Sequence, residues 1–382
     1  METIQPTLKR GRDVWNQINM PLKEFHKRID QVREEMKKED MDLLLLYGNG
    51  ANNYGNPCYL TNFVTKMARG ALVVLPSKGD PTLIVQGFPR DEPAVKNTTW
   101  IEDIRSCSNI PLECIEYLKE KNLMSSTIGL AGLKQYMPYD QFRLLSGSLE
   151  QCKIIDANPI ISKLRMTKSE REQDHVRRSS RIISRAFEFL CNGPLPRLDE
   201  IILDANLDYG ARIDGAEDIR ILLAKPLETE WAFRTAGDVA ISDGDRIIIY
   251  LAVAFERYWA EGIRTFEVRS SSLIDQTSDD AGALYERILN MIIPGKALSQ
   301  FYGEATGEIG KSPMDELGEY GLGQGIGLSL HESPVIDQNA TGHFEEGMCF
   351  ALHVMSKDKE IGPCITGETI LLSKEKAEVL TV

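Results

Sequence analysis

The feature that most constrains this chain is a glycine-rich segment at residues 323–334, with the sequence Gly-Gln-Gly-Ile-Gly-Leu-Ser-Leu-His-Glu-Ser-Pro. Four further sequence segments lie on either side of it. Residues 244–251 and 257–266 precede it, and two strand-like runs follow at residues 346–353 and 365–372. Because these segments follow one another over residues 244–372, they restrict the carboxy-terminal half of the chain to very few folds.

In this order, the segments resemble the signature motifs of the pita-bread family. That family includes creatinase, Xaa-Pro aminopeptidases, prolidases and methionine aminopeptidases. The resemblance implies an α/β amino-terminal domain like that of creatinase, followed by an α+β pita-bread domain. It also identifies the positions that bind two metal ions in the family's metallopeptidases.

All five of those metal-ligand positions are changed in this chain. A two-metal hydrolase needs carboxylates and an imidazole that hold two cations about 3.5–4 Å apart, and a carboxamide oxygen is a poorer donor than an imidazole nitrogen. We therefore predict no catalytic metal site and no cofactor, although Glu368 adjoins the last position and could help to rebuild an ion site. The residues at the five positions are Tyr250, Glu261, Gln324, His353 and Gly367.

Local patterns outside the motifs predict the organisation of the chain. Residues 1–20 are predicted to form an amino-terminal arm, residues 21–160 the creatinase-like domain and residues 161–382 the pita-bread domain. Pro21 opens a helix with apolar residues every three or four positions, and short apolar runs at 42–47, 71–75 and 82–85 predict strands covered on both faces. Ser169 and Glu172 have the spacing of a capping box at the start of another helix.

The substitutions at the ligand positions favour an enzyme that works without metal. Tyr250, Glu261, Gln324 and His353 are polar, whereas a decayed site would more often fill with aliphatic side chains, because unpaired buried polar groups cost free energy. Histidine exchanges protons near neutral pH. We expect His353 and Glu261 to transfer protons during hydrolysis or elimination at a C–N bond of a small molecule.

The resemblance implies roles for further residues around the same site. His331 matches a histidine that touches substrate in the family, so we expect His331 and Tyr250 to orient the substrate. We also expect Gln324, Glu332 and Arg264 to contact it, and Arg264 could neutralise Glu261.

Two other regions supply candidates for the substrate wall. Creatinase needs no metal and uses a histidine that precedes the segment corresponding to residues 244–251, which begins with Gly244 and Asp245. Counting back from Gly244 places that position at about Trp231, which could stack on a planar ligand. The segment at residues 56–63 resembles a family segment near the active site and adds the candidates Cys58, Tyr59 and Phe63.

Two alternatives remain open. Tyr250, Glu261, Arg264 and His353 could form a satisfied buried network in an inactive pseudo-peptidase that serves as a binding module. An Xaa-Pro-type peptidase with an atypical metal site is the second alternative. His26, His175 and His343 lie outside the motifs, and we expect all three at the surface.

Composition limits the partners. The net charge of −13 argues against binding to nucleic acid, and no apolar run is long enough for a membrane span. The seven cysteines lack a regular spacing, and the amino-terminal residues lack a signal pattern, so we expect reduced thiols in a cytoplasmic protein. The family resemblance implies a homodimer that acts on a small-molecule substrate.

Overall fold

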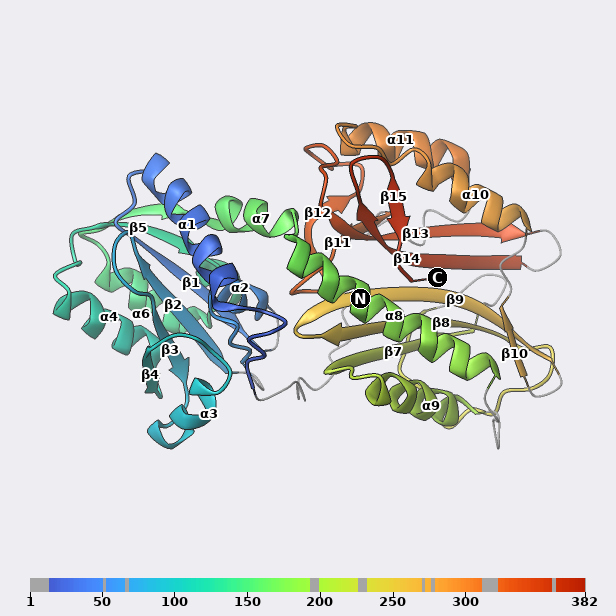
Figure 1. Ribbon diagram of the computed structural model, residues 1–382, viewed down its shortest axis with the longest axis horizontal. Helices are drawn as coiled ribbons and strands as arrows, with labels where there is room; N and C mark the ends of the chain where they lie inside the picture. Colours follow the sequence, from blue (N-terminus) through green and yellow to red (C-terminus); the bar gives the residue numbers. More distant parts are fainter. Residues whose placement is uncertain are drawn as a thin grey trace. The chain divides into compact units, whose positions relative to one another are not determined.

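The computed structural model describes residues 14–50, 53–65, 69–192, 199–225, 232–269, 272–275, 279–310, 322–358 and 362–381 (Figure 1). The chain divides into two compact units, one ending at Arg165 and the other beginning at Met166. Most of the expected arm, residues 1–13, and the candidate Trp231 lie outside the described residues. Among the described helices, none has the length and apolar composition needed to span a bilayer.

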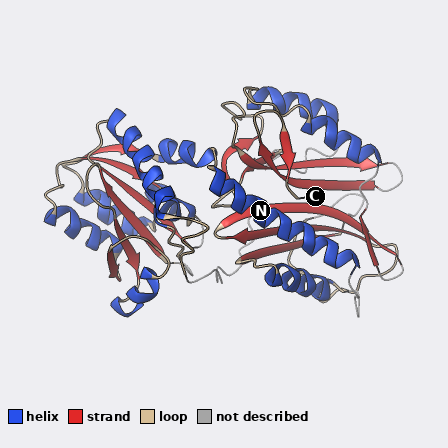
Figure 2. Cartoon of the chain, viewed as in Figure 1, coloured by secondary structure: helices blue, strands red, loops and turns tan. Residues whose placement is uncertain are grey.

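The amino-terminal unit is an α/β layer, as the sequence predicts (Figure 2). The helix expected after Pro21 and the three expected strands all form, with bounds that differ from the predicted ones by a few residues at most. The elements are α1 (Leu22–Lys38), β1 (Leu43–Asn49), α2 (Gly55–Thr61), β2 (Gly70–Pro76), β3 (Thr82–Gln86), a 3₁₀ turn (Pro89–Asp91), α3 (Glu92–Lys96), β4 (Asp103–Cys107), α4 (Ile110–Glu120), β5 (Thr127–Ala131), α5 (Leu133–Tyr136), α6 (Tyr139–Ser148), β6 (Lys153–Asp156) and α7 (Asn158–Met166).

The sheet of this unit has the order β4-β3-β2-β1-β5-β6. Strand β1 is antiparallel to β2 and parallel to β5. Alternate residues of β1, including Leu43 and Leu45, pack against α4 and α6, and the intervening Leu44 and Leu46 are equally buried. Both faces of the strand are therefore covered, which explains why β1 is a continuous apolar run.

The carboxy-terminal unit is the expected pita-bread domain, a long antiparallel sheet with helices packed on it (Figure 1). The sheet order is β12-β11-β13-β14-β9-β8-β7, with β10 beside β9 and β15 beside β14. The elements are α8 (Glu170–Asn192), α9 (Glu200–Ile213), β7 (Asp218–Ala224), β8 (Arg246–Phe255), β9 (Tyr258–Arg269), β10 (Ser272–Asp275), α10 (Asp279–Leu289), α11 (Leu298–Ile309), β11 (Gly323–Gly325), β12 (Glu332–Ile336), β13 (Cys349–Asp358), β14 (Gly362–Leu372) and β15 (Ala377–Val379).

This domain consists of two halves, each with its own core. Helices α8 and α9 pack on β7, β8 and β9. Helices α10 and α11 pack on β12, β13 and β14. The two halves meet where β9 lies beside β14, and across the described residues these strands are in register at one position, Gly367 opposite Ile263.

The capping box predicted for α8 is present. The Ser169 backbone N–H donates to Glu172 Oε2 at 2.9 Å, and the Glu172 backbone N–H donates to Ser169 Oγ at 3.3 Å. These bonds satisfy two N–H groups that the first turn of a helix otherwise leaves without a partner. The start of α8 was therefore predictable from local sequence.

Candidate functional site

A tight hairpin places Glu261 on the face of the sheet opposite the helices. Strands β8 and β9 are joined at Glu256 and Arg257, whose φ angles of 47° and 73° are typical of a two-residue hairpin turn. Because side chains alternate along a strand, Glu261 and Ile263 share one face and Arg264 lies on the other. The register sets Tyr250 opposite Ile263, diagonal to Glu261.

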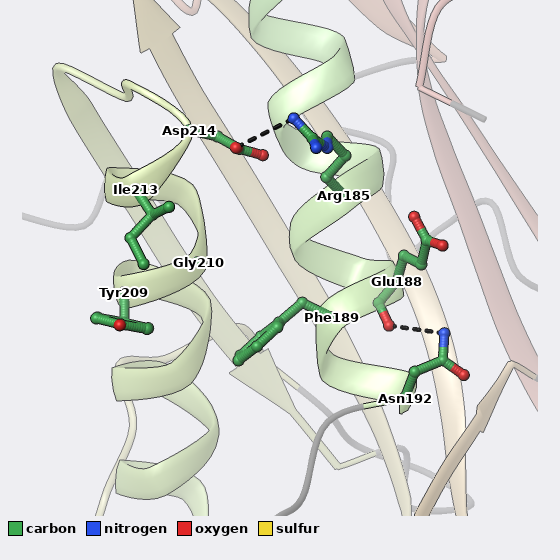
Figure 3. Close-up of a pocket in the computed structure, with 8 residues that line it drawn as sticks. All are labelled: Arg185, Glu188, Phe189, Asn192, Tyr209, Gly210, Ile213 and Asp214. Atoms are coloured by element: carbon green, nitrogen blue, oxygen red, sulfur yellow. Dashed lines mark hydrogen bonds and ion pairs between the residues drawn. The ribbon is translucent and has the colours of Figure 1, made fainter.

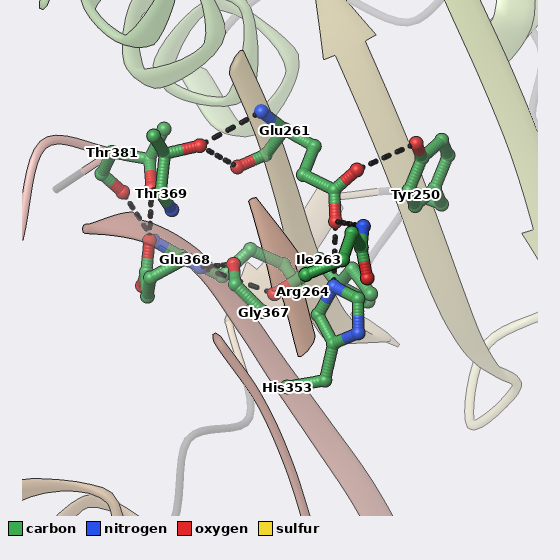
Figure 4. Close-up of polar contacts among 10 residues, drawn as sticks. Tyr250, Glu261, Ile263, Arg264, His353, Gly367, Glu368, Thr369 and Thr381 are labelled. Atoms are coloured by element: carbon green, nitrogen blue, oxygen red, sulfur yellow. Dashed lines mark hydrogen bonds and ion pairs between the residues drawn. The ribbon is translucent and has the colours of Figure 1, made fainter. Parts of the chain in front are cut away.

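Three of the predicted residues lie around the carboxylate of a fourth, Glu261 (Figure 4). His353 Nε2 lies 2.6 Å from Glu261 Oε1. The Tyr250 hydroxyl donates to Glu261 Oε2 at 2.9 Å, and the Gln324 side-chain amide donates to Oε1 at 3.4 Å. Glu261 is 1% exposed and His353 is 8% exposed, so the cluster is almost enclosed by protein.

These contacts keep Glu261 ionised. Burial alone would raise its carboxyl pKa, but the hydrogen bond and charge of His353, together with the Tyr250 hydroxyl, lower that pKa below its ordinary value. Burial and the nearby Glu261 carboxylate raise the pKa of Tyr250 well above the usual range. Tyr250 is therefore a neutral phenol that donates to an ionised carboxylate.

The ionised carboxylate determines which nitrogen of His353 carries a proton. A carboxylate only accepts hydrogen bonds, so the 2.6 Å contact requires a proton on Nε2. Within the described residues, Nδ1 makes no hydrogen bond to the protein. The Glu261–His353 pair therefore has the hydrogen-bond arrangement of a carboxylate–imidazole dyad, in which one ring nitrogen faces the carboxylate.

Arg264 does not neutralise Glu261, so this prediction was wrong. It projects from the opposite face of β9, where Nη2 lies 2.7 Å from Glu368 Oε1 and Nε lies 3.7 Å from Asp275 Oδ2. Glu368 likewise points away from Glu261 and His353, because position 367 lies on the His353 face of β14 and the next residue along a strand faces the other side. The hydrogen-bonded network around Glu261 contains Tyr250 and His353, as the pseudo-peptidase alternative supposed, but not Arg264.

The residues at the family's ligand positions do not fit two metal ions. Both Glu261 oxygens already accept hydrogen bonds, and Tyr250 is a protonated phenol. A Cβ atom added to Gly367 would lie 2.6 Å from Ile263 Cγ1, so Ile263 occupies the space that a longer side chain would need there. The described residues contain no group of three or more His, Cys, Asp or Glu side chains placed to hold a metal.

The two candidates at the end of the glycine-rich segment, His331 and Glu332, have different surroundings. His331 is exposed, and its charge helps to lower the pKa of Glu261. Glu332 was expected to contact substrate, but its carboxylate is committed to a buried ion pair with Lys168 Nζ at 3.1 Å and accepts from the Ser329 backbone N–H at 3.0 Å. Glu332 therefore holds the segment in place.

The three candidates in the amino-terminal unit, Cys58, Tyr59 and Phe63, differ in how deeply they are buried. Cys58 and Tyr59 lie on α2 and are each 2% exposed. The guanidinium of Arg28 lies 4.7 Å from the Tyr59 ring centre, so both side chains belong to the packed interior and not to the expected substrate wall. Phe63 follows α2, is half-buried and lines a cavity of about 220 Å³ in that unit.

One of the remaining histidines was placed wrongly. His26 and His343 are exposed as expected, but His175 is buried and stacks on Tyr258 with ring centres 5.4 Å apart. Position 175 falls on the inner face of the amphipathic helix α8, and that periodicity could have predicted the burial.

The sequence analysis missed Thr369 and Thr381, which hold the backbone around the site. The Thr369 hydroxyl donates to the Glu261 carbonyl at 2.8 Å and accepts from the Glu261 N–H at 2.9 Å. The Thr381 hydroxyl accepts from the Thr369 N–H at 3.0 Å and donates to Glu368. Their sequence separation from Glu261 leaves no local signal for these contacts.

A groove of about 390 Å³ lies elsewhere on the same domain, between α8 and α9 (Figure 3). Phe189, Tyr209 and Ile213 supply its apolar surface, and Arg185 pairs with Asp214 at 3.1 Å across one end. None of the residues predicted from the motifs lines this groove. Its position on the outer helices separates it from the Glu261 cluster.

Comparison with known proteins identifies the family. The model of the Creatinase/Prolidase N-terminal domain matches residues 28–167, and that of Metallopeptidase family M24 matches residues 174–374, more than half of the chain. This chain belongs to metallopeptidase family M24. The predicted pita-bread family is thereby confirmed.

Several known proteins resemble the chain over most of its length. An Xaa-Pro dipeptidase of Pyrococcus horikoshii is 24% identical over 72% of this chain and 79% of its own length. The peptidase YqhT of Bacillus subtilis, described as uncharacterized, is 22% identical over 84% and 88%. The solved X-Pro aminopeptidase of Thermotoga maritima aligns over 93% of this chain and 97% of its own, with a TM-score of 0.75 and 21% identity.

Proposed function

We propose that this M24 member is a metal-independent enzyme that hydrolyses a C–N bond in a small molecule. The observation that carries the proposal is the buried Glu261–His353 pair, with Nε2 and Oε1 2.6 Å apart. In this pair a low-pKa carboxylate orients an imidazole, which is an arrangement suited to general acid–base catalysis near neutral pH.

The proposed reaction begins with proton transfer to His353 Nδ1 from a water molecule. The oxygen of that water bonds to the carbon of the C–N bond, and the imidazolium returns the proton to the nitrogen as the C–N bond breaks. Glu261 stabilises the imidazolium through Nε2, and Tyr250 and Gln324 hold Glu261. If His353 takes the proton from carbon instead of water, the same pair would support elimination, the lyase form of the proposal.

The donor set gives the reason to propose a route without metal. Tyr250, Gln324 and Gly367 replace three of the family's ligands, and Ile263 fills the space beside Gly367. We expect far less than one equivalent of Mn, Co, Zn or Fe per purified chain, and we expect chelators to leave activity unchanged. Two bound metals per chain, measured by elemental analysis, would instead support a peptidase with an atypical metal site.

A binding module without catalysis is the alternative, and the hydrogen bonding of the cluster favours it. Tyr250, Gln324 and His353 satisfy the Glu261 carboxylate without any ligand. A network of this kind can stabilise a fold in place of lost ions. The aliphatic Ile263 and Met355 are buried on the same side of the sheet, which is the filling expected of a decayed site.

His353→Gln separates the two functions. The glutamine amide can still donate to Glu261, but it cannot exchange protons near neutral pH. A screen of guanidino, cyclic-amidine and amide compounds by thermal shift would supply the substrate. We expect His353→Gln to keep the melting temperature and to lose turnover, with His343→Ala as the exposed-histidine control. No turnover of any compound by the unmodified protein would favour the binding module.

The remaining roles are also proposals. His331, Gln324 and Phe63 are proposed to contact the substrate. We further propose a cytoplasmic homodimer, consistent with seven cysteines that form no disulfide. Light scattering of the purified protein would give the oligomeric state.

A further inference from the structure

The Glu261–His353 pair spans the line where the two halves of the pita-bread sheet meet. Glu261 is carried by β9, which pairs with β8 over ten residues. His353 is carried by β13, which pairs with β14 over ten residues. The distance between the two side chains therefore depends on how β9 is joined to β14.

The junction between β9 and β14 relies on side chains more than on backbone pairing. Within the described residues, register is shared only at Gly367 and Ile263. On one side of that position, the Thr369 hydroxyl bonds both the N–H and the carbonyl of Glu261. On the other side, the Thr265 hydroxyl accepts from the Ile365 N–H at 3.1 Å and donates to the Ile365 carbonyl at 3.3 Å. Each threonine replaces one backbone pair of the ladder.

Further hydrogen bonds fix the position of Thr369 (Figure 4). Its N–H donates to Thr381 Oγ1, whose hydroxyl donates to the Glu368 carboxylate. Arg264 Nη2 then contacts both Glu368 and the Thr381 carbonyl, at 2.7 and 2.6 Å. Thr369 is 0% exposed and Thr381 is 1% exposed, so water does not compete for these bonds.

We infer that Thr369 is a positioning residue for the Glu261–His353 pair, an inference that rests on the proposed function. Its hydroxyl fixes the backbone from which the Glu261 side chain extends, and the chain of bonds through Thr381 to Glu368 and Arg264 fixes Thr369. Thr265 makes the same kind of contact across the same junction, but it bonds Ile365 and not Glu261. The two threonines therefore differ in whether they position the site.

Thr369→Val and Thr265→Val make a matched pair, because each removes one buried hydroxyl and keeps the side-chain shape. The readout is the NMR resonance of the His353 Nε2–H, assigned by its loss in His353→Gln. A short hydrogen bond to a carboxylate moves this proton downfield. We expect the resonance to shift upfield in Thr369→Val and to stay in place in Thr265→Val, with a similar loss of melting temperature in both. Thr369→Ser, which restores the hydroxyl, should return the resonance to its original position.

Turnover supplies the second readout once a substrate is known. We expect Thr369→Val to lower kcat by about 10- to 100-fold with little change in KM, and Thr265→Val to lower it much less. Equal effects of the two valine variants on the Nε2–H resonance would overturn the positioning role. If no compound is turned over but the resonance still separates the variants, Thr369 positions the pair and the proposed catalysis is what fails.

Discussion

Two buried carboxylates on opposite faces of the same sheet behave in opposite ways. Glu261, on the face with His353, has a pKa below the ordinary value, and Glu368, on the face with Arg264, has a pKa raised to about 7. Both are almost inaccessible to solvent. Burial raises the pKa of both carboxyls, so the difference between them comes from their hydrogen-bond and charge partners.

The partners of the two carboxylates explain the difference. Glu261 accepts from His353 and Tyr250, and both donors are aimed at its oxygens. Glu368 shares the Arg264 guanidinium with Asp275, and Arg264 also donates to backbone carbonyls. Burial is the largest influence on Glu368, and Asp275 adds repulsion, so the shared cation compensates only in part.

The largest predicted effect comes from making the same substitution at both carboxylates. Glu261→Gln removes the charge that stabilises the imidazolium, and we expect turnover to fall by about 10²- to 10⁴-fold. Glu368 lies on the other face, and we expect Glu368→Gln to reduce turnover by about tenfold at most. Steady-state kinetics of the two variants on the compound found by screening makes this test, and equal losses would contradict the separate roles of the two faces.

The second prediction concerns stability against pH. Because the pKa of Glu368 is about 7 in the folded chain and near ~4.3 when unfolded, the folded state binds more protons between these values. The contribution of Glu368 to the free energy of unfolding is therefore full below about pH 4.3. It falls by roughly 3 kcal/mol as the pH rises to about 7.

Denaturant unfolding at several pH values measures this loss. Glu368→Gln should abolish it, so the difference in unfolding free energy between the variant and the original chain should grow from pH 4.5 to 7. Glu261→Gln should act in the opposite sense and at lower pH, since the contribution of Glu261 is lost as the pH falls through its lowered pKa. The same slope in both variants would contradict the comparison.

The third prediction tests the packing beside Gly367, on the face of the sheet that carries Glu261. Gly367→Ala places a methyl group 2.6 Å from Ile263 Cγ1, and overpacking of this kind costs about 1–3 kcal/mol. Ile263→Val alone should cost less, and combining it with Gly367→Ala should recover part of the loss. A double-mutant cycle by thermal unfolding would measure the coupling, and strictly additive losses would show that Ile263 does not fill this space.

The smallest predicted effect comes from a substitution at the start of α8, away from both carboxylates, and serves as a reference for a purely structural loss. Ser169→Ala removes one half of the capping box of α8, and loss of such a cap costs about 1 kcal/mol. We expect this loss in unfolding free energy with turnover unchanged. A change in turnover would mean that the start of α8 influences the site.

Much of the fold was predictable because its signals are local. The spacing of apolar residues in α1, the capping box of α8 and the apolar run of β1 each depend on neighbours within a few positions. The motif order also predicted that Tyr250, Glu261, Gln324 and His353 would meet. The side-chain alternation that separates Arg264 from Glu261 was equally available from the sequence, and neglecting it led to the wrong partner.

By itself, the sequence determined the family, the two-domain order and the residues that meet around Glu261. The tertiary structure alone decided how those residues are paired and charged. His353 lies 92 residues from Glu261, and Thr369 lies 108 residues away, so their contacts depend on the register of strands from two halves of a sheet. A hydrogen bond requires placement to within a few tenths of an ångström, and packing sets that placement, together with the commitment of Glu332 to Lys168 and the filling of the Gly367 position by Ile263.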